Sequence, residues 1–548
     1  MYKLIILLLI CPVLHSEELD KILWGDSQLT SPLNFDFISS EFKNYKENNL
    51  SGVYSINSSP IGLGFEVLKN DNVIQSLDPD KILNNFPKFS IPISITNNRV
   101  TVLNKKIIET NHHFWDLSFS DGKAWNDSKN IFVSVPFALL QKNANCVHNG
   151  ILVFALDKSE KVSKSIVQIS SETCSYFQFN YVAIFDSSFE KKELILNKDI
   201  KEFNTRNFVE IYDKYPNIEQ KSFADSDSFS SSEVTAYGFY DGEDHFIGSC
   251  KTRSGDYPFC DDILLPAYSL TKTISGTFGV AAYQKKYGFI EDLRVRNLIS
   301  SCSHRKWKDV TLENLADMTT GNYKSSQHSV DEDSLASLNF IFNLKDSNQK
   351  EKFACNNYPN KSKPGRRFVY HSSDTYLLGV ALNNLLQEKV ETDYFDDLLV
   401  PIFSDINLSE KIKYTRRTID ENRQPYTGWG MFFERDDLLK INNLLRSSII
   451  SEHFSELYIN EALQLTEDKG FLAIKSSNIY YNNGLWSAKF DKNIFGCKND
   501  IYVPFMSGFG GITVVFLPNS MIYYYVSDSF TFSWYPAVYA AHQMKSLC

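Results

Sequence analysis

The sequence predicts an α+β protein whose first part is β-rich and whose second part mixes helices with strands. Residues 17–225 contain many short apolar runs and little helical periodicity. Helical patterns begin near residue 269, and strand-like runs return after residue 510. Because strands before and after a helical middle can join one antiparallel sheet, we expect helices packed on such a sheet over residues 226–548.

The β-rich N-terminal domain is predicted from runs of β-branched and aromatic residues bounded by Asn, Asp and Ser. These runs are FSIPISI (89–95), RVTVL (99–103), NIFVSVPFALL (130–140), GILVFAL (150–156) and YVAIF (181–185). Many short antiparallel strands of this kind commonly form two packed sheets, so we expect a sandwich, whose role the sequence does not indicate. A Ser- and Asp-rich stretch at 223–233 is typical of a linker or an exposed loop.

The second region begins with a predicted β-hairpin over 234–249. The run SLTKTISGTFGVAAYQKKYG, which starts at Ser269, predicts a helix of small and apolar residues. Further helices are predicted over 312–323, 374–387 and 436–450, and further strands over 511–518 and 521–528.

Composition and charge are those of an acidic globular protein. The 548 residues are enough for two or more hydrophobic cores of ordinary domain size. Aromatic residues make up 14% of the chain, which favours β-rich or ligand-binding surfaces. The net charge of −10 argues against nucleic acid as the main partner, because phosphate binding needs a basic surface.

Residues 1–16 have the pattern of a secretory signal peptide. Lys3 precedes an apolar stretch from Leu4 to Leu14, and Ser16 is a suitable residue before the cleavage point. The stretch is too short for a membrane anchor, which needs about 20 apolar residues. We therefore expect a secreted or periplasmic protein with no transmembrane segment.

Removal of the signal peptide leaves eight cysteines, an even number that favours disulfides in an exported chain. Order along the sequence suggests the pairs Cys146–Cys174, Cys250–Cys260, Cys302–Cys355 and Cys497–Cys548, among 105 possible connectivities. Free buried cysteines are the alternative. The sequence has no C-x-x-C or H-x-x-x-H spacing, and we expect neither a metal nor a cofactor.

A serine and a lysine three positions apart, Ser269 and Lys272, stand at the start of a predicted helix. This spacing puts both side chains on one helix face, about one turn apart. A neutral lysine amine can accept the serine proton, which makes the serine a nucleophile for acyl transfer. The spacing is not specific by itself, because S-x-x-K also occurs at Ser40–Lys43, Ser120–Lys123, Ser188–Lys191, Ser303–Lys306 and Ser347–Lys350.

The surroundings of Ser269 distinguish it from the other matches. Three segments follow in a recognisable order: SLTK at 269–272, PGRRFVYHSSDTYLLG at 364–379 and SGFGGITVVF at 507–516. This order resembles the serine β-lactamase-related superfamily, in particular class C-like enzymes, esterases and 6-aminohexanoate-dimer hydrolases. The segments Thr311–Gly321 and Gly428–Leu438 are similar to two further family segments, and the resemblance covers about residues 230–548.

The resemblance implies that Ser269 is the nucleophile, with Lys272 as the adjacent base and Tyr370 as the tyrosine of the family's Y-x-N or Y-x-S motif. A tyrosine is a poor base unless a neighbouring ammonium stabilises its phenolate, and Lys272 would supply that charge. A buried core tyrosine is the alternative. Ser372 takes the Asn or Ser position of the motif and would bind substrate or Lys272, or else cap a helix.

The third motif departs from the family's best-known form, in which a lysine attracts a substrate carboxylate. The segment 507–513 contains neither lysine nor histidine, which favours an ester or amide over a β-lactam. Its glycines would allow substrate to approach the strand closely, although a simple bulge is the alternative. We expect Gly510, Gly511 and Ile512 to bind substrate, with an N–H near Gly511 or Ile512 joining that of Ser269 in an oxyanion hole.

These patterns together predict an exported serine hydrolase that acts on a small-molecule or peptide-like ester or amide through an acyl-enzyme on Ser269. The sequence carries no signal for an oligomeric state. Two alternatives stay open: a penicillin-recognising peptidase or β-lactamase, and an inactive binding protein that keeps the fold. His112 and His113 are weak metal or triad candidates, because adjacent strand residues point to opposite faces. His371 packs locally beside Tyr370 or tunes it.

Overall fold

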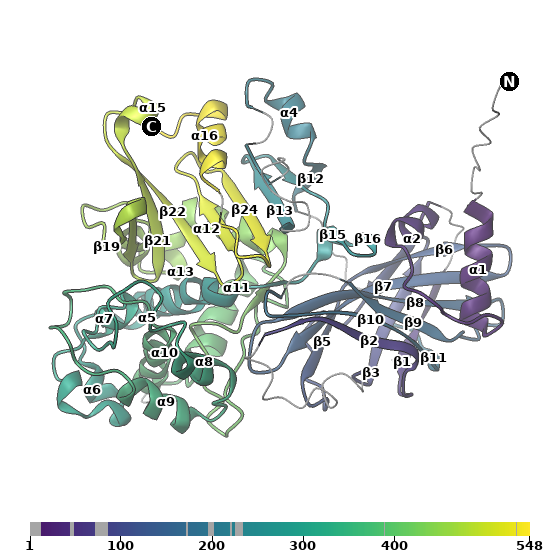
Figure 1. Cartoon of the computed structure of the whole chain (residues 1–548), viewed down its shortest axis with the longest axis horizontal. Coiled ribbons are helices and arrows are strands. Elements are labelled where there is room, and N and C mark those ends of the chain that lie inside the picture. Colours follow the sequence, from purple (N-terminus) through teal and green to yellow (C-terminus); the bar gives the residue numbers. More distant parts are fainter. Residues whose placement is uncertain are drawn as a thin grey trace.

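The computed structural model places two large β-sheets next to each other along the long axis of the molecule (Figure 1). The N-terminal part of the chain forms one sheet, and the C-terminal part forms the other with its surrounding helices. The structure describes residues 12–43, 49–71, 86–170, 174–195, 202–219, 222–224, 234–387, 389–532 and 534–548.

The N-terminal sheet is antiparallel, with the order β11-β1-β3-β4-β6-β7-β8-β9-β10-β2 and β5 paired to β7. Its strands are β1 (Asn49–Ile56), β2 (Ile61–Asn70), β3 (Phe89–Thr96), β4 (Arg99–Val102), β5 (Trp115–Phe119), β6 (Gly122–Asn126), β7 (Asn130–Gln141), β8 (Val147–Asp157), β9 (Ser165–Ile169), β10 (Phe177–Phe185) and β11 (Ser187–Lys191). The five runs predicted as strands all lie in this sheet.

Hydrogen bonds join all of these strands into one ladder and not into two separate sheets, and the ladder curls so that Tyr54 of β1 stacks on Phe154 of β8. Strand β7 pairs with β8 along its whole length, with β6 through its first half and with β5 through its second half. The helices α1 (Pro12–Trp24) and α2 (Phe35–Glu41) lie beside this sheet, and α1 contacts β8. Strands β7 and β8 are buried on both faces, which explains their nearly continuous apolar sequences.

The C-terminal sheet has the order β12-β14-β13-β24-β23-β22-β21-β20-β19, and only β12 and β14 pair in parallel among these strands. Its strands are β12 (Asn204–Asn207), β13 (Val234–Tyr240), β14 (Asp244–Ile247), β19 (Phe471–Ile474), β20 (Ile479–Asn482), β21 (Leu485–Phe490), β22 (Ile501–Gly508), β23 (Ile512–Phe516) and β24 (Ile522–Ser527). Since β12 already belongs to it, the change from one sheet to the other falls before the boundary expected at residue 225.

Helices cover both faces of the C-terminal sheet, so its central strands are buried. Side chains along β24 alternate between two cores. Tyr523 and Tyr525 pack in the core that contains Val538 of α16 (Tyr535–Met544), whereas Tyr524 lies in the core that contains Leu438 of α12 (Arg435–Arg446). This layering confirms the α+β expectation for the second region.

The helices of the C-terminal part lie mostly on the side of the sheet that carries α5 and α10 (Figure 1). They are α4 (Glu210–Lys214), α5 (Phe278–Tyr287), α6 (Val295–Leu298), α7 (Leu312–Ala316), α8 (Leu335–Phe342), α9 (Ser347–Asn356), α10 (Ser372–Leu386), α11 (Val400–Asp405), α12 (Arg435–Arg446), α13 (Ile450–His453), α14 (Glu456–Ala462), α15 (Lys492–Phe495) and α16 (Tyr535–Met544). The helix predicted over 312–323 is much shorter, because Met318 and Gly321 adopt positive φ values of 53° and 76°.

The segment that begins at Ser269 is helical but not one regular helix. A 3-10 turn (Tyr268–Leu270) is followed by a π-helical stretch (Lys272–Thr277), and regular α-helix begins only at Phe278. Short π-helical insertions are often found at functional sites.

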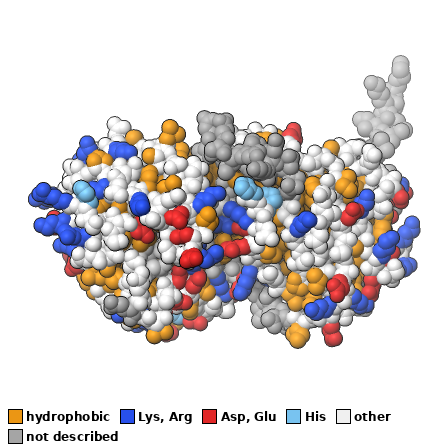
Figure 2. Space-filling view, turned by 90° about the horizontal axis from the view of Figure 1, so that it is seen from below, with side chains coloured by type: hydrophobic (Ala, Val, Ile, Leu, Met, Phe, Trp, Pro, Cys, Tyr) orange, Lys and Arg blue, Asp and Glu red, His pale blue; other side chains and the backbone are white. Residues whose placement is uncertain are grey.

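All four disulfide pairs suggested by sequence order are present, with Cα–Cα separations of 5.0 Å for Cys146–Cys174 and Cys302–Cys355 and 5.4 Å for the other two. Among the described residues, no helix has both the length and the apolar composition to cross a membrane. Residues 1–11 of the expected signal peptide and residues 225–233 of the expected linker lie outside the described residues. Figure 2 shows acidic and basic side chains intermingled near the middle of one face.

Candidate active site

Ser269 is held in place by segments from both sides. Just before it, β17 (Leu265–Pro266) pairs with β18 (Phe432–Phe433). On the other side, β22 passes so closely that a Cβ on Gly508 would lie 3.1 Å from the Ala267 carbonyl oxygen. The absence of a side chain at Gly508 therefore lets the strand run against the serine.

Lys272 is the direct neighbour of Ser269. Its Nζ lies 3.1 Å from Ser269 Oγ and 2.8 Å from Ser372 Oγ, and it donates to the Gly428 carbonyl oxygen at 2.9 Å. Only 2% of the lysine is exposed. Burial lowers the pKa of Lys272 to about 8, although the Glu332 carboxylate acts in the opposite direction. About a tenth of the amine is thus neutral at pH 7, which is far more than for an ordinary exposed lysine and is the form that can accept a proton.

Tyr370 joins this group from the segment before α10. The Lys272 Nζ lies 5.0 Å from the centre of the Tyr370 ring, which stacks on Trp486 with ring centroids 5.7 Å apart. Burial and the Glu332 carboxylate raise the pKa of Tyr370, while a hydrogen bond with Ser269 acts in the opposite direction. Burial and the Glu332 carboxylate thus act against the phenolate that the sequence motifs led us to expect, although Lys272 does lie beside the ring.

Ser372 carries a contact that the sequence motifs did not predict. Its backbone N–H donates to Glu332 Oε2 at 2.9 Å, and its hydroxyl donates to the other oxygen of that carboxylate. Ser372 is the first residue of α10 and not its N-cap, which is His371. The helix-cap alternative for Ser372 is therefore wrong, and Lys272, Ser372 and Glu332 form a hydrogen-bonded chain.

The third motif reaches the site through residues other than those expected. The cavity beside Ser269 is lined at the end of β22 by Ser507, Gly508 and Phe509. The expected substrate-binding residues, which are not among the lining residues, are Gly510, Gly511 and Ile512. The physical reason is the turn into β23, where Gly510 and Gly511 adopt φ values of 84° and 100°. The glycines serve this tight turn, and the strand edge beside Ser269 ends before them.

The cavity has a volume of about 230 Å³ and walls that are mainly aromatic. The aromatic residues that line it are Tyr268, Phe342, Tyr370, Trp429, Trp486, Phe509 and Phe532. Its charged lining residues are Glu332 and Asp333, and no lysine or arginine is among the described residues that line it. Burial lowers the pKa of His328, a further lining residue, so this imidazole is neutral at pH 7.

The N-terminal sheet supplies part of the cavity wall. Ala144 and Asn145, in the turn between β7 and β8, line the cavity together with Ser269. The buried Asn145 side chain accepts from the Gly430 N–H at 2.7 Å and donates to the Met431 carbonyl at 2.9 Å. Asn145 thus holds the segment that immediately follows Gly428, whose carbonyl accepts from Lys272. No sequence signal linked this asparagine to the site, because it lies far outside the family-like region.

His371 lies behind Tyr370 and points into an acidic group. Its ring is 1% exposed, with Nε2 3.0 Å from an Asp331 oxygen and Nδ1 3.7 Å from an Asp374 oxygen. Burial alone would lower the pKa of His371, but the two carboxylates raise it to about 9. His371 therefore remains protonated at neutral pH and anchors the start of α10.

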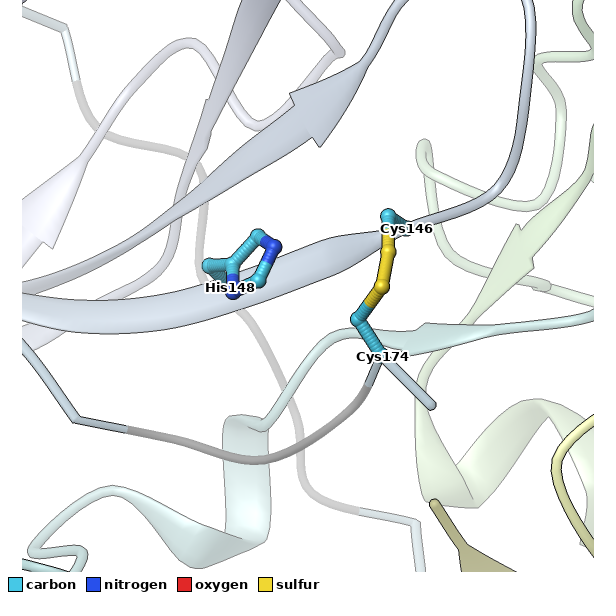
Figure 3. Close-up of side chains that lie close together, drawn as sticks. All are labelled: Cys146, His148 and Cys174. Atoms are coloured by element: carbon cyan, nitrogen blue, oxygen red, sulfur yellow. A yellow bond between two sulfur atoms is a disulfide. The ribbon is translucent and has the colours of Figure 1, made fainter. Parts of the chain in front are cut away.

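One group of possible metal ligands comes together outside this site. The side-chain ligand atoms of Cys146, His148 and Cys174 lie within 4.8 Å of one another (Figure 3). The two sulfur atoms are joined in a disulfide, so neither is a free thiolate that could bind a metal. Burial lowers the pKa of His148 to about 3, so it is a neutral imidazole beside the disulfide.

No protein-family model and no curated protein matches the sequence. Among solved structures, the chain is similar to a protein described as a 6-aminohexanoate-dimer hydrolase from Bacillus anthracis, with 15% identity over 63% of this chain and 88% of that one (TM-score 0.42). It is also similar to a D-stereospecific amidohydrolase from Streptomyces sp., with 14% identity over 54% and 90% (0.40).

A third similar structure is a mutant class C β-lactamase, with 14% identity over 57% of this chain and 92% of that chain (TM-score 0.39).

Proposed function

We propose that the protein is an exported serine hydrolase that cleaves an ester or amide through an acyl-enzyme on Ser269. The observation that carries this proposal is the position of Lys272, a buried amine with its pKa lowered to about 8 and its Nζ 3.1 Å from Ser269 Oγ, beside an open cavity. The four disulfides support export, because such bonds persist in oxidising compartments.

In the proposed reaction, neutral Lys272 accepts the Ser269 hydroxyl proton while Oγ attacks the substrate carbonyl carbon. The resulting ammonium remains next to Ser372 and the Gly428 carbonyl, which hold it in place. The protonated phenol of Tyr370 donates its proton to the leaving alcohol or amine as the carbonyl–leaving-group bond breaks, and Lys272 restores that proton. A water molecule then attacks the acyl-enzyme by the same proton transfers in reverse.

The oxyanion of the tetrahedral intermediate needs two N–H donors. We assign this role to the backbone N–H groups of Ser269 and Phe509, since both residues line the cavity and β22 passes beside the serine. This assignment replaces Gly511 and Ile512, which lie beyond the turn.

A fluorophosphonate probe tests the nucleophile. We expect the purified protein to gain one probe adduct on Ser269, located by peptide mass spectrometry, and Ser269→Ala to gain none. Failure of the folded protein to react, with circular dichroism confirming the fold, would contradict the proposal and favour an inactive binding protein. Turnover of a chromogenic cephalosporin in preference to a p-nitrophenyl ester would favour a β-lactamase instead.

A further inference from the structure

The charge of the cavity carries information about the substrate beyond its scissile bond. Its two ionisable acids, Glu332 and Asp333, lie on the same loop, and no described residue forms an ion pair with either. Glu332 accepts hydrogen bonds from the neutral Ser372, and its charge also acts on Lys272 and on the protonated His371 without an ion pair. Neither Lys272 nor His371 is among the residues that line the cavity, so the two carboxylates are the charges that a ligand meets there.

The aromatic walls of the cavity reinforce this negative character. Trp429 and Trp486 are more than nine-tenths buried as residues, and both line the cavity with the part of the ring that Lys350 (on Trp429) or Tyr370 and Phe505 (on Trp486) do not cover. The face of an indole ring attracts cations, and tryptophan does so most strongly of the aromatic side chains. Buried aromatic rings next to carboxylates are a common arrangement for binding an ammonium group.

We propose that the site selects esters or amides that carry an ammonium group close to the scissile carbonyl, and that it rejects matched substrates carrying a carboxylate. The inference rests on the proposed function for the reaction, but the cation preference itself concerns only the cavity. Asp333 and the Trp429–Trp486 walls contact the ammonium, while Glu332 lies between it and the catalytic serine. The same charges repel the carboxylate that a β-lactam carries.

The test uses three p-nitrophenyl esters with the same chain length. One acyl group ends in a trimethylammonium, the second in the isosteric tert-butyl group, and the third in a carboxylate. Each kcat/KM is divided by the hydroxide-catalysed rate constant of the same ester, which removes differences in intrinsic reactivity. We expect the cationic ester to exceed its neutral isostere by about tenfold, since a cation–aromatic contact reinforced by a carboxylate contributes roughly 1–2 kcal/mol. The carboxylate ester should be the poorest of the three.

Asp333→Asn is the diagnostic variant, because Asp333 is exposed and Glu332 has a separate contact with Ser372. We expect the cationic-to-neutral ratio to fall several-fold in this variant. Asp405→Asn removes the same charge from an exposed position at the end of α11 and should leave the ratio unchanged. An equal ratio in the wild type and both variants, with Ser269-dependent hydrolysis intact, would overturn the cation inference and leave the proposed function standing.

A binding measurement covers the case in which no ester is hydrolysed. Phenyltrimethylammonium is titrated into the wild type, Asp333→Asn and Asp405→Asn, with tryptophan fluorescence as the readout, since two tryptophans line the cavity. Saturable quenching that weakens only in Asp333→Asn would support the cation site even if the proposed hydrolysis fails. Absence of saturable binding in the wild type would overturn the inference.

Discussion

Two S-x-x-K pairs in this chain share a sequence pattern and a buried lysine, yet they build different environments. Ser269 and Lys272 bring an amine onto a serine hydroxyl beside a cavity. At the start of α9, Ser347 Oγ instead donates to an Asp420 oxygen at 2.5 Å, and Lys350 Nζ donates to the Phe340 carbonyl oxygen at 2.6 Å. Neither Ser347 nor Lys350 is among the residues that line the cavity.

The two lysines also differ in what surrounds the amine. Lys350 is fully buried within 4.9 Å of three ring centres, those of Phe340, Tyr426 and Trp429. Burial lowers its pKa well below the usual lysine value, as burial also lowers that of Lys272. A lowered lysine pKa therefore does not identify a base. The neighbouring serine hydroxyl and an open cavity make the difference.

The largest contrast should come from removing the two hydroxyls. Ser269→Ala should reduce hydrolysis of the p-nitrophenyl ester by about 10³-fold or more, because no acyl-enzyme can form. Ser347→Ala should keep activity within about threefold, since its hydroxyl bonds to the side chains of Asp420 and Asn422 and does not line the cavity. Steady-state kinetics on both variants, with matched thermal melts, checks this. Comparable losses in the two variants would erase the proposed distinction.

The next-largest contrast should come from replacing the two lysines. Lys272→Met should lower kcat by about 10³-fold, within the range expected for loss of an acid–base group. Lys350→Met should leave kcat within about threefold, and its Tm should be unchanged or higher. The reason is that an apolar side chain of similar length replaces a buried amine that forms no ion pair with any described carboxylate. Kinetics and differential scanning calorimetry on the pair give the comparison. A large kcat loss in Lys350→Met would show that the aromatic-lined lysine also takes part.

The pH dependence should reveal only one of these amines. Since neutral Lys272 is the active form, kcat/KM should rise about tenfold per pH unit up to about pH 8 and level off above it. Between about pH 6 and pH 8 the total increase is about 50-fold, because half of the amine is still protonated at its pKa. A pH–rate profile of the neutral ester, corrected for spontaneous hydrolysis, gives the inflection. We expect the Lys350→Met variant to retain the inflection. Loss of the inflection in this variant would assign it to Lys350 instead of Lys272.

The smallest effect is expected where the two environments meet. Gly428 accepts from Lys272 and the adjacent Trp429 contacts Lys350, while Asn145 holds the following residues through two buried hydrogen bonds. Asn145→Ala should lower the free energy of unfolding by about 1–3 kcal/mol and reduce kcat/KM about tenfold, because the Lys272 acceptor is less firmly placed. Urea denaturation and ester kinetics measure the two effects. A wild-type free energy of unfolding together with a wild-type kcat/KM would mean that the contact of Asn145 with Gly430 and Met431 supports neither stability nor activity.

The sequence predicted those parts of the molecule that local pattern determines. The β-strands at 89–96 and 130–141 and the helix at 372–386 follow their apolar patterns closely. The ordered motifs also predicted the close approach of Ser269 and Lys272. Glu332 was missed because its loop is placed by tertiary packing, and no spacing rule connects it to Ser372.

Other misses have the same long-range origin. Gly510 and Gly511 were expected at the site because a glycine-rich run does not indicate which of its residues turn and which face a neighbour. Asn145 was missed because its hydrogen bonds to Gly430 and Met431 depend on how the two sheets pack against each other, which no local sequence pattern predicts. The pKa direction of Tyr370 was missed because it depends first on the burial of the ring and then on the unpredicted Glu332 carboxylate.

Residues of the turn between β7 and β8 line the cavity but take no part in the proposed proton transfers. Ala144 and Asn145 belong to a sheet that contains none of the proposed proton-transfer residues. Asn145 also holds the segment after Gly428, so it has to be kept, whereas no side-chain hydrogen bond links Ala144 to that segment. A library confined to Ala144 would vary the cavity wall without removing a contact that places Lys272, which makes this turn of the N-terminal sheet a starting point for changing substrate choice.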